Sequence, residues 1–190
     1  MASKPGERKL QILQVIAEML QDPAAEKITT AALAKRIDVS EAALYRHFAS
    51  KAQMFEGLIE FIESSLFTVI NKIAAEEEHG LRQVQMMLSL LLGFAEKNRG
   101  LTRVLIGDAL VHENPRLQVR INQLLDRIEV SFKQALRIAV SQGNLPAEHD
   151  VSAHANILRC YALGRWHQFV KSGFRTAPLE IWPQQWPLLI

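Results

Sequence analysis

The chain has 190 residues, of which 48% are hydrophobic and 22% charged, as in ordinary folded proteins with a sizeable core. Its formal net charge of +2 is too small to indicate nucleic-acid binding, which must therefore be argued from where the charges lie. The single cysteine, Cys160, excludes an intrachain disulfide, and the longest apolar run, residues 86–95, is shorter than the roughly 20 residues that span a bilayer. We expect a soluble cytoplasmic protein with no membrane partner.

Helical periodicity runs through nearly the whole sequence, whereas strand signals are almost absent. We predict an all-α fold: an N-terminal three-helix domain with a helix-turn-helix (residues 1–52) and a larger helical domain for dimerisation and partner binding (residues 53–190). The predicted helices cover residues 7–21, 30–37, 41–48, 50–78, 81–97, 100–111, 115–142 and 150–171. Three prolines between residues 177 and 190 predict a broken helix or irregular cover there.

The second and third predicted helices form the helix-turn-helix. Thr29 or Thr30 caps the first of them, Ser40 caps the second, and Leu44 and Phe48 supply the buried stripe beneath it. In such units the second helix enters the major groove, so its exposed face needs short or hydrogen-bonding side chains. The residues that meet this requirement are Ser40, Glu41, Ala42, Ala43, Tyr45, Arg46 and His47.

Individual contacts to DNA follow from this placement. Ala42 and Ala43 can approach thymine methyl groups, and Ser40 can reach a base edge or a phosphate. Phosphate contacts are expected from the side chains of the chain's arm and helix ends, and from free N–H groups at the two helix N-termini. The predicted DNA-binding residues are Thr29, Thr30, Ser40, Glu41, Ala42, Ala43, Tyr45, Arg46, His47 and Lys51, with Lys4, Arg8 and Lys9 as further phosphate contacts. Spacing alone leaves open a solvated three-helix cap in which Arg46 pairs with Glu56.

One stretch carries a specific resemblance. Residues 28–34 read Ile-Thr-Thr-Ala-Ala-Leu-Ala, residues 39–48 read Val-Ser-Glu-Ala-Ala-Leu-Tyr-Arg-His-Phe, and Ser-Lys follows at 50–51. This pattern, with its Tyr-x-His-Phe-x-Ser-Lys ending, resembles the TetR family of DNA-binding regulators. The resemblance implies an all-helical homodimer with nine helices that binds palindromic double-stranded DNA.

A closer resemblance extends into the second domain, over roughly residues 28 to 130. Residues 54–63, 90–94, 98, 100–103 and 120–124 are similar to the nucleoid occlusion branch of the TetR family. Membership of that branch implies a protein that binds chromosomal sites as a dimer. On DNA it would engage the tubulin-like division protein FtsZ and inhibit Z-ring assembly over the nucleoid. The alternative within the family is a ligand-responsive transcriptional repressor.

The predicted partner site lies in the fourth and fifth helices. Phe61 falls off the apolar stripe formed by Phe55, Ile59, Ile62, Leu66 and Ile73, so it needs another neighbour or a partner. The predicted partner-binding residues are Phe61, Leu90, Gly93, Lys97 and Asn98. The same pattern also fits Phe61 packing within the chain and Leu90 in the core. Val69 and Lys97 stand where relatives can carry arginine, and lysine lacks the bidentate fork of that residue.

The remaining predictions concern assembly and small ligands. Two helices are predicted to form a four-helix dimer interface with their symmetry mates. The first carries an apolar stripe that can serve both core and interface: Leu117, Ile121, Leu124, Ile128, Phe132 and Leu136. The second carries Ala153, Ile157, Tyr161, Gly164 and Phe169. An inducer pocket would be lined by Met86, Met87, Phe94, Cys160 and Trp166, but no sequence feature supports one. No cofactor motif, metal-ligand spacing or nucleophile beside a base is present, so we predict no cofactor, metal site or enzyme activity.

Overall fold

We analysed a computed structural model, which describes residues 5–22 and 28–190. These residues contain nine α-helices and two short 3-10 helices but no strand, so the all-α prediction is confirmed. The helices are α1 (Pro5–Met19), α2 (Thr30–Ile37), α3 (Glu41–Tyr45), α4 (Lys51–Glu76), α5 (Gly80–Lys97), α6 (Arg99–Leu105), η1 (Asp108–Leu110), α7 (Pro115–Ser141), α8 (Val151–Lys171), α9 (Trp182–Gln185) and η2 (Trp186–Leu188). No helix among them is long and apolar enough to cross a membrane.

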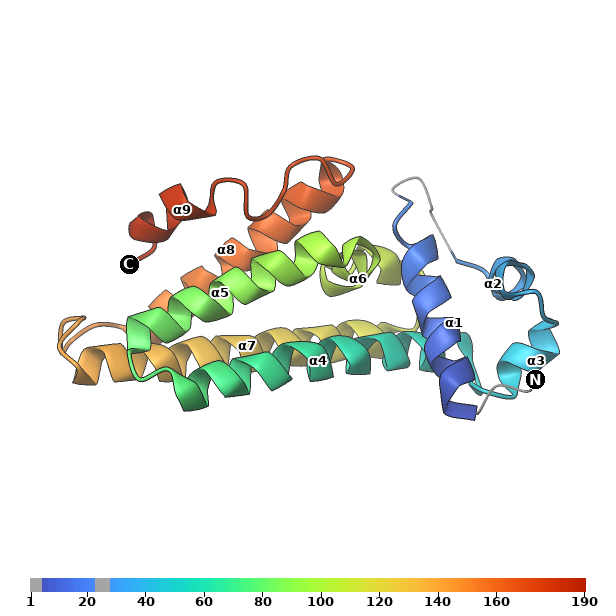
Figure 1. Cartoon of the computed structure of the whole chain (residues 1–190), viewed down its shortest axis with the longest axis horizontal. Coiled ribbons are helices and arrows are strands. Elements are labelled where there is room, and N and C mark those ends of the chain that lie inside the picture. Colours follow the sequence, from blue (N-terminus) through green and yellow to red (C-terminus); the bar gives the residue numbers. More distant parts are fainter. Residues whose placement is uncertain (1–4, 23–27) are drawn as a thin grey trace. The chain divides into compact units, whose positions relative to one another are not determined.

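The chain divides into two compact units. The first contains residues 1–62 and 98–121, and the second contains residues 63–97 and 122–190. Both α4 and α7 therefore begin in the first unit and continue into the second. In the first unit α1 packs against α2 and α6, and it crosses the start of α4 (Figure 1).

The buried face of α1 carries Ile12, Ile16 and Leu20 at helical spacing. The sequence predicts Leu10, Leu13 and Ile16, with Met19 or Leu20, on this face. Leu10 is 62% exposed, and Leu13 and Met19 are half-buried, so the observed stripe is centred on Ile12, which the prediction missed. The α1–α6 crossing is close: a Cβ on Gly100 would lie 2.0 Å from the carbonyl oxygen of Ala17, so only a hydrogen fits there.

In the second unit α5 packs against α8, and the C-terminal segment covers both helices (Figure 1). The indole Nε1 of Trp166 in α8 donates a hydrogen bond of 3.1 Å to the carbonyl oxygen of Leu91 in α5. The buried guanidinium of Arg165 holds the cover, since Nη2 donates to the carbonyl oxygens of Ala177 at 2.8 Å and Pro178 at 3.2 Å. The predicted irregular C-terminal segment is thus held against α8 by hydrogen bonds from Arg165 to its main-chain carbonyl groups.

Burial within the chain corrects part of the predicted dimer interface. The six apolar residues predicted to form a stripe on α7, from Leu117 to Leu136, are all buried within one chain, so they serve the core and do not remain open to a second chain. Phe169 of α8 is likewise buried. The predicted end of α7 is close to the observed one, because Gly143 adopts φ +74° and its left-handed conformation ends the helix.

Candidate functional site

The helix-turn-helix is formed by α2 and α3, and both helices begin with side-chain caps. Thr29 Oγ1 accepts a hydrogen bond of 3.1 Å from Ala32 N, and Ser40 Oγ accepts one of 3.2 Å from Ala43 N. Asp38 closes α2 with a left-handed backbone (φ 58°), which produces the sharp turn between the helices. These local features explain why two such short helices form at defined positions.

A direct hydrogen bond links the two helices at their N-terminal ends. Thr30 Oγ1 donates to Glu41 Oε2 at 2.5 Å. Glu41 therefore has a partner within the helix-turn-helix, which favours a role in orienting α3 over a role in reading bases. Leu44 and Phe48 are buried beneath α3, as predicted, and Phe48 lies under the ammonium of Lys9, 5.6 Å from its ring centroid.

The predicted reading face of α3 points outward. Ser40, Ala42, Tyr45 and Arg46 are exposed, and Ala43 and His47 are half-buried. The helix ends at Tyr45, earlier than the predicted Phe48, so Arg46 and His47 lie in the turn that follows. The pairing of Arg46 with Glu56 is not observed, because the Glu56 carboxylate accepts Arg116 Nε at 2.9 Å.

Lys51 is the predicted contact whose surroundings differ most from expectation. It is the first residue of α4, and its Nζ pairs with the carboxylate of Glu113 in the segment between η1 and α7. The two side chains are only 20% and 11% exposed. Sequence reasoning missed both Glu113 and Arg116, because 60 or more positions separate each from its partner on α4 and no local pattern signals the pairing. Lys4, a predicted phosphate contact, lies outside the described residues.

The predicted partner-binding residues are described within their own units. In the first unit Phe61 on α4 is 48% exposed, which agrees with its place off the buried stripe. In the second unit Leu90 and Gly93 are half-buried on α5, and Lys97 is exposed at its end. A Cβ on Gly93 would lie 3.6 Å from Cδ1 of Leu179, so the C-terminal segment covers part of the surface that was predicted to be open. Asn98, directly before α6, is half-buried and has an interaction partner.

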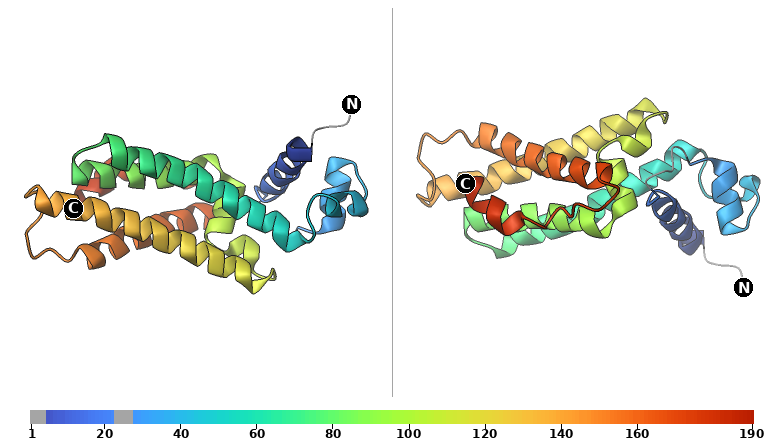
Figure 2. Two further views of the ribbon diagram at one scale, coloured as in Figure 1. Left: turned by 90° about the horizontal axis from the view of Figure 1, so that it is seen from below. Right: turned by 90° about the horizontal axis from the view of Figure 1, so that it is seen from above.

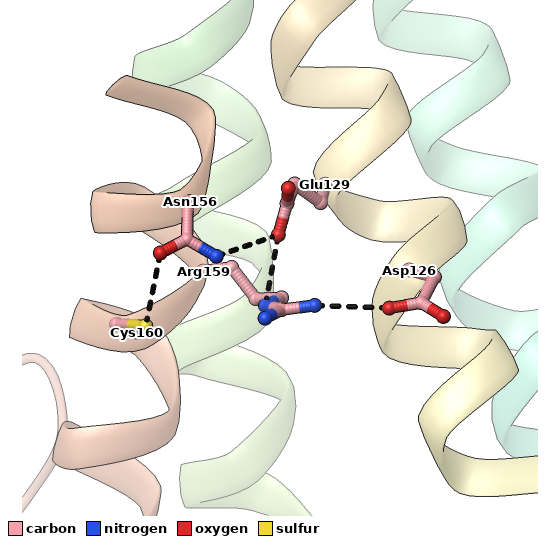
Figure 3. Close-up of polar contacts among 5 residues, drawn as sticks. All are labelled: Asp126, Glu129, Asn156, Arg159 and Cys160. Atoms are coloured by element: carbon pink, nitrogen blue, oxygen red, sulfur yellow. Dashed lines mark hydrogen bonds and ion pairs between the residues drawn. The ribbon is translucent and has the colours of Figure 1, made fainter. Parts of the chain in front are cut away.

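Helix α8 lies beside α7 in both views of Figure 2. One exposed face of α8 carries small and apolar residues. Ala153, Ile157, Cys160 and Gly164 are exposed at intervals of three or four residues, and Ile157 is 56% exposed. A polar network borders this face (Figure 3): Arg159 Nη1 donates to Asp126 Oδ1 at 2.9 Å, and its Nε lies 3.0 Å from Glu129 Oε2.

The network around Arg159 extends along α8. Glu129 Oε2 also accepts Asn156 Nδ2 at 3.1 Å, while the Asn156 amide oxygen faces the thiol of Cys160 at 3.7 Å. The Arg159 Nε is close enough to Glu129 for an ion pair, but it has no aligned hydrogen bond and no solvent access. The polar border of the α8 face is therefore held in place by several contacts at once.

Comparison with known proteins decides the family. Residues 12–58 match the family of bacterial regulatory proteins, tetR family, and residues 78–190 match the family described as tetracyclin repressor-like, C-terminal domain, SlmA-like. The chain is 52% identical to the nucleoid occlusion factor SlmA of Marinomonas sp. (strain MWYL1) over 100% of this chain and 96% of that protein. It is 51% identical to the SlmA of Alteromonas mediterranea over 97% and 95%. The chain belongs to the SlmA family.

The wider TetR fold is shared more loosely. A TetR transcription regulator from Haloarcula marismortui superimposes with a TM-score of 0.80 over 97% of this chain and 96% of its own, at 16% sequence identity. At this identity the likeness shows the fold alone. The SlmA relatives instead share about half of their residues with this chain over alignments that cover 97% or more of it. The resemblance that the sequence indicated, to the nucleoid occlusion branch of the TetR family, is therefore confirmed.

Proposed function

We propose that this SlmA family member acts as a homodimer that binds palindromic chromosomal sites through α2 and α3 and binds FtsZ through α4 and α5, thereby inhibiting Z-ring assembly over the nucleoid. The observation that carries the proposal is the identity of about half of all residues with nucleoid occlusion factors, including the region of the second unit. Fold relatives with other roles share only about a sixth of their residues.

The DNA-binding part of the proposal is supported by the geometry of α3. Its caps and the buried Leu44 and Phe48 hold the helix in one position, while Ser40, Ala42 and Tyr45 remain exposed. Short side chains allow the backbone to approach base edges, and Tyr45 can donate to a phosphate beside the groove. The free N–H groups at the starts of α2 and α4 add anion-binding capacity.

The dimer is proposed to form through the exposed face of α8 with the adjoining part of α7. Val130 and Ile157 are each 56% exposed, and covering these two apolar side chains by a second copy would remove their surface from water. Around Gly164 nothing lies within 4 Å of a Cβ position, so a second helix can approach closely. The Arg159 network would form the polar rim of this interface.

Leu90 and Lys97 on α5 are proposed to contact FtsZ in the second unit, and Phe61 on α4 is proposed as a separate contact in the first unit. Phe61 presents an aromatic ring to solvent, and aromatic residues are enriched at the centres of protein interfaces. Lys97 supplies a positive charge that can pair with an acidic segment, although without the bidentate geometry of arginine. Leu179 borders the same face of α5 beside Gly93 and would be part of the contact surface.

The alternative is a ligand-responsive repressor with an inducer pocket in the second unit. Of the residues predicted to line it, Met87 and Trp166 are 2% and 1% exposed, so both side chains are buried. Cys160, which was expected to line the same pocket, lies on the surface. The positions of these three residues do not favour the predicted pocket.

Two experiments test the proposal. Pulldown of the chromosomal DNA bound by the protein, followed by sequencing, should recover many sites scattered over the chromosome, whereas one or two promoter sites would favour a repressor.

Sedimentation of FtsZ polymers with GTP should show that the DNA-bound protein lowers the pelleted fraction of FtsZ. Phe61→Ala and Leu90→Glu should abolish this effect and keep DNA binding, with Thr68→Ala, also exposed on α4, as the control. Full inhibition by both variants would remove these residues from the FtsZ site.

A further inference from the structure

We infer that Glu113 is an intramolecular competitor of DNA for the side chain of Lys51, so that DNA binding exchanges a carboxylate for a phosphate at the start of α4. The inference rests on the proposed DNA-binding function and adds a positioning residue to it. In the DNA-free protein the Lys51 ammonium is already neutralised by Glu113. A phosphate approaching this pair would gain little attraction from Lys51 and would be placed beside a second anion.

The surroundings of the pair determine how strongly Glu113 competes. Both side chains are mostly buried, so water screens their attraction less than at an exposed ion pair. The Lys51 ammonium also lies 5.6 Å from the centroid of the Phe55 ring, which favours the positive charge at this position. The lysine stem is nevertheless flexible, and its head carries the same donors whether it faces a carboxylate or a phosphate.

A second ion pair joins α4 to the start of α7, three residues after Glu113, and does not involve Lys51. Arg116 Nε lies 2.9 Å from Glu56 Oε1, one and a half turns further along α4. The Arg116 side chain is 54% exposed and the Glu56 side chain 26%, so this pair is more solvated than the first. Loss of the Lys51 contact would thus loosen the segment before α7 without detaching it. Glu56 also provides a matched control, because removing its charge has the same formal effect on the protein as removing that of Glu113.

A double-mutant cycle on DNA affinity tests the exchange. The duplex carries a site recovered from the chromosomal pulldown, and its dissociation constant is measured by fluorescence anisotropy over a series of salt concentrations. Glu113→Gln should tighten binding about fivefold, because Lys51 no longer leaves a partner, and this gain should vanish in the Lys51→Gln background. Glu56→Gln should change the affinity less than about twofold. Glu113→Asp, which keeps the charge but shortens the reach, should give a smaller gain than Glu113→Gln and covers the case in which Glu113→Gln fails to fold.

Each other outcome overturns a defined statement. Unchanged or weaker binding by a folded Glu113→Gln protein contradicts the competition, as does equal tightening in the Lys51→Gln background, which would reveal a general charge effect. Equal tightening by Glu56→Gln has the same meaning. A wild-type protein that binds no duplex at low salt contradicts the proposed DNA-binding function itself, whereas additive effects in a wild-type protein that binds DNA contradict only the role of Glu113.

Discussion

The hydroxyl of Thr30, at the start of α2, donates a hydrogen bond of 2.5 Å to the carboxylate of Glu41, at the start of α3. This contact fixes the two helices of the helix-turn-helix at the ends that would face DNA. Thr30→Val keeps the side-chain shape but removes the donor, so we expect DNA affinity to fall about fivefold, the effect of losing roughly 1 kcal/mol of orientation. Thr30→Ser should retain wild-type affinity in the same titration. Equal affinity of the valine and serine variants would show that the hydrogen bond does not orient α3.

Ser40 has two roles: it caps the N-terminus of α3, and it lies on the face of α3 that is proposed to contact DNA. Two substitutions separate these roles. Ser40→Ala removes the acceptor for Ala43 N and should lower the free energy of unfolding by about 1 kcal/mol. Ser40→Asp restores the acceptor and suits the positive end of the helix, so its stability should match the wild type. Its carboxylate should nevertheless repel DNA phosphates and abolish binding. Chemical unfolding and anisotropy measure the two effects, and strong DNA binding by Ser40→Asp would remove this residue from the interface.

Ile157 should be central to the proposed dimer. Ile157→Asp places a charge on the exposed α8 face, so we expect the protein to sediment as a monomer and to lose affinity for palindromic DNA by more than tenfold, since desolvating an unpaired carboxylate costs several kcal/mol. Thr68→Asp on α4 adds the same charge at an exposed position away from α8 and should remain dimeric. A dimeric Ile157→Asp protein would place the interface elsewhere.

Arg165 should hold the C-terminal cover against α8. Arg165→Met leaves the carbonyl groups of Ala177 and Pro178 without their donor, at a cost of about 1–3 kcal/mol each where they are buried. Hydrogen exchange should therefore accelerate over residues 177–189, with a smaller change in α5 and α8. Arg175→Met removes a solvent-exposed arginine near the same segment and serves as the control. Unchanged exchange in Arg165→Met would mean that apolar packing alone retains the cover.

The N-terminus of α8 should respond to acid through Asp150. Hydrogen bonds from Ala153 N and then Ser152 N lower the pKa of its carboxylate below the usual 3.8. A lowered pKa means that the ionised cap favours the folded state above pH 3.8, and that this contribution is lost as the pH falls through the folded-state value. The wild type should therefore exceed Asp150→Ala in unfolding free energy at pH 7, and the difference should shrink toward pH 3. A difference independent of pH would contradict this assignment.

The helices that the sequence predicts best are those with local signals. Thr29, Ser40 and Asp150 are caps whose side chains bond within three residues, so their effect can be read from a short window. The turn after Gly143 is similar, because one left-handed residue ends α7. The family could also be predicted from the sequence, because the Tyr-x-His-Phe-x-Ser-Lys pattern is contiguous.

Contacts between segments that are distant in the sequence could not be predicted from local patterns. The pairing of Lys51 with Glu113 joins residues on two different segments, and nothing near Lys51 distinguishes a paired ammonium from a free one. The same applies to α7, where periodicity indicated an apolar stripe but not which surface covers it; the stripe proved to be buried by its own chain. Leu179 reached Gly93 through a C-terminal segment with no regular period.

The close approach of Gly100 to the Ala17 carbonyl gives the molecule a natural site for a conditional mutation. A methyl group at position 100 would meet main-chain atoms of α1, which cannot rotate aside as a side chain can. Gly100→Ala should therefore shift α1 and so destabilise the helix-turn-helix domain, without changing any group on its surface. In cells that carry such an allele, the protein would dissociate from its chromosomal sites on warming. Nucleoid occlusion could then be switched off during a single division cycle.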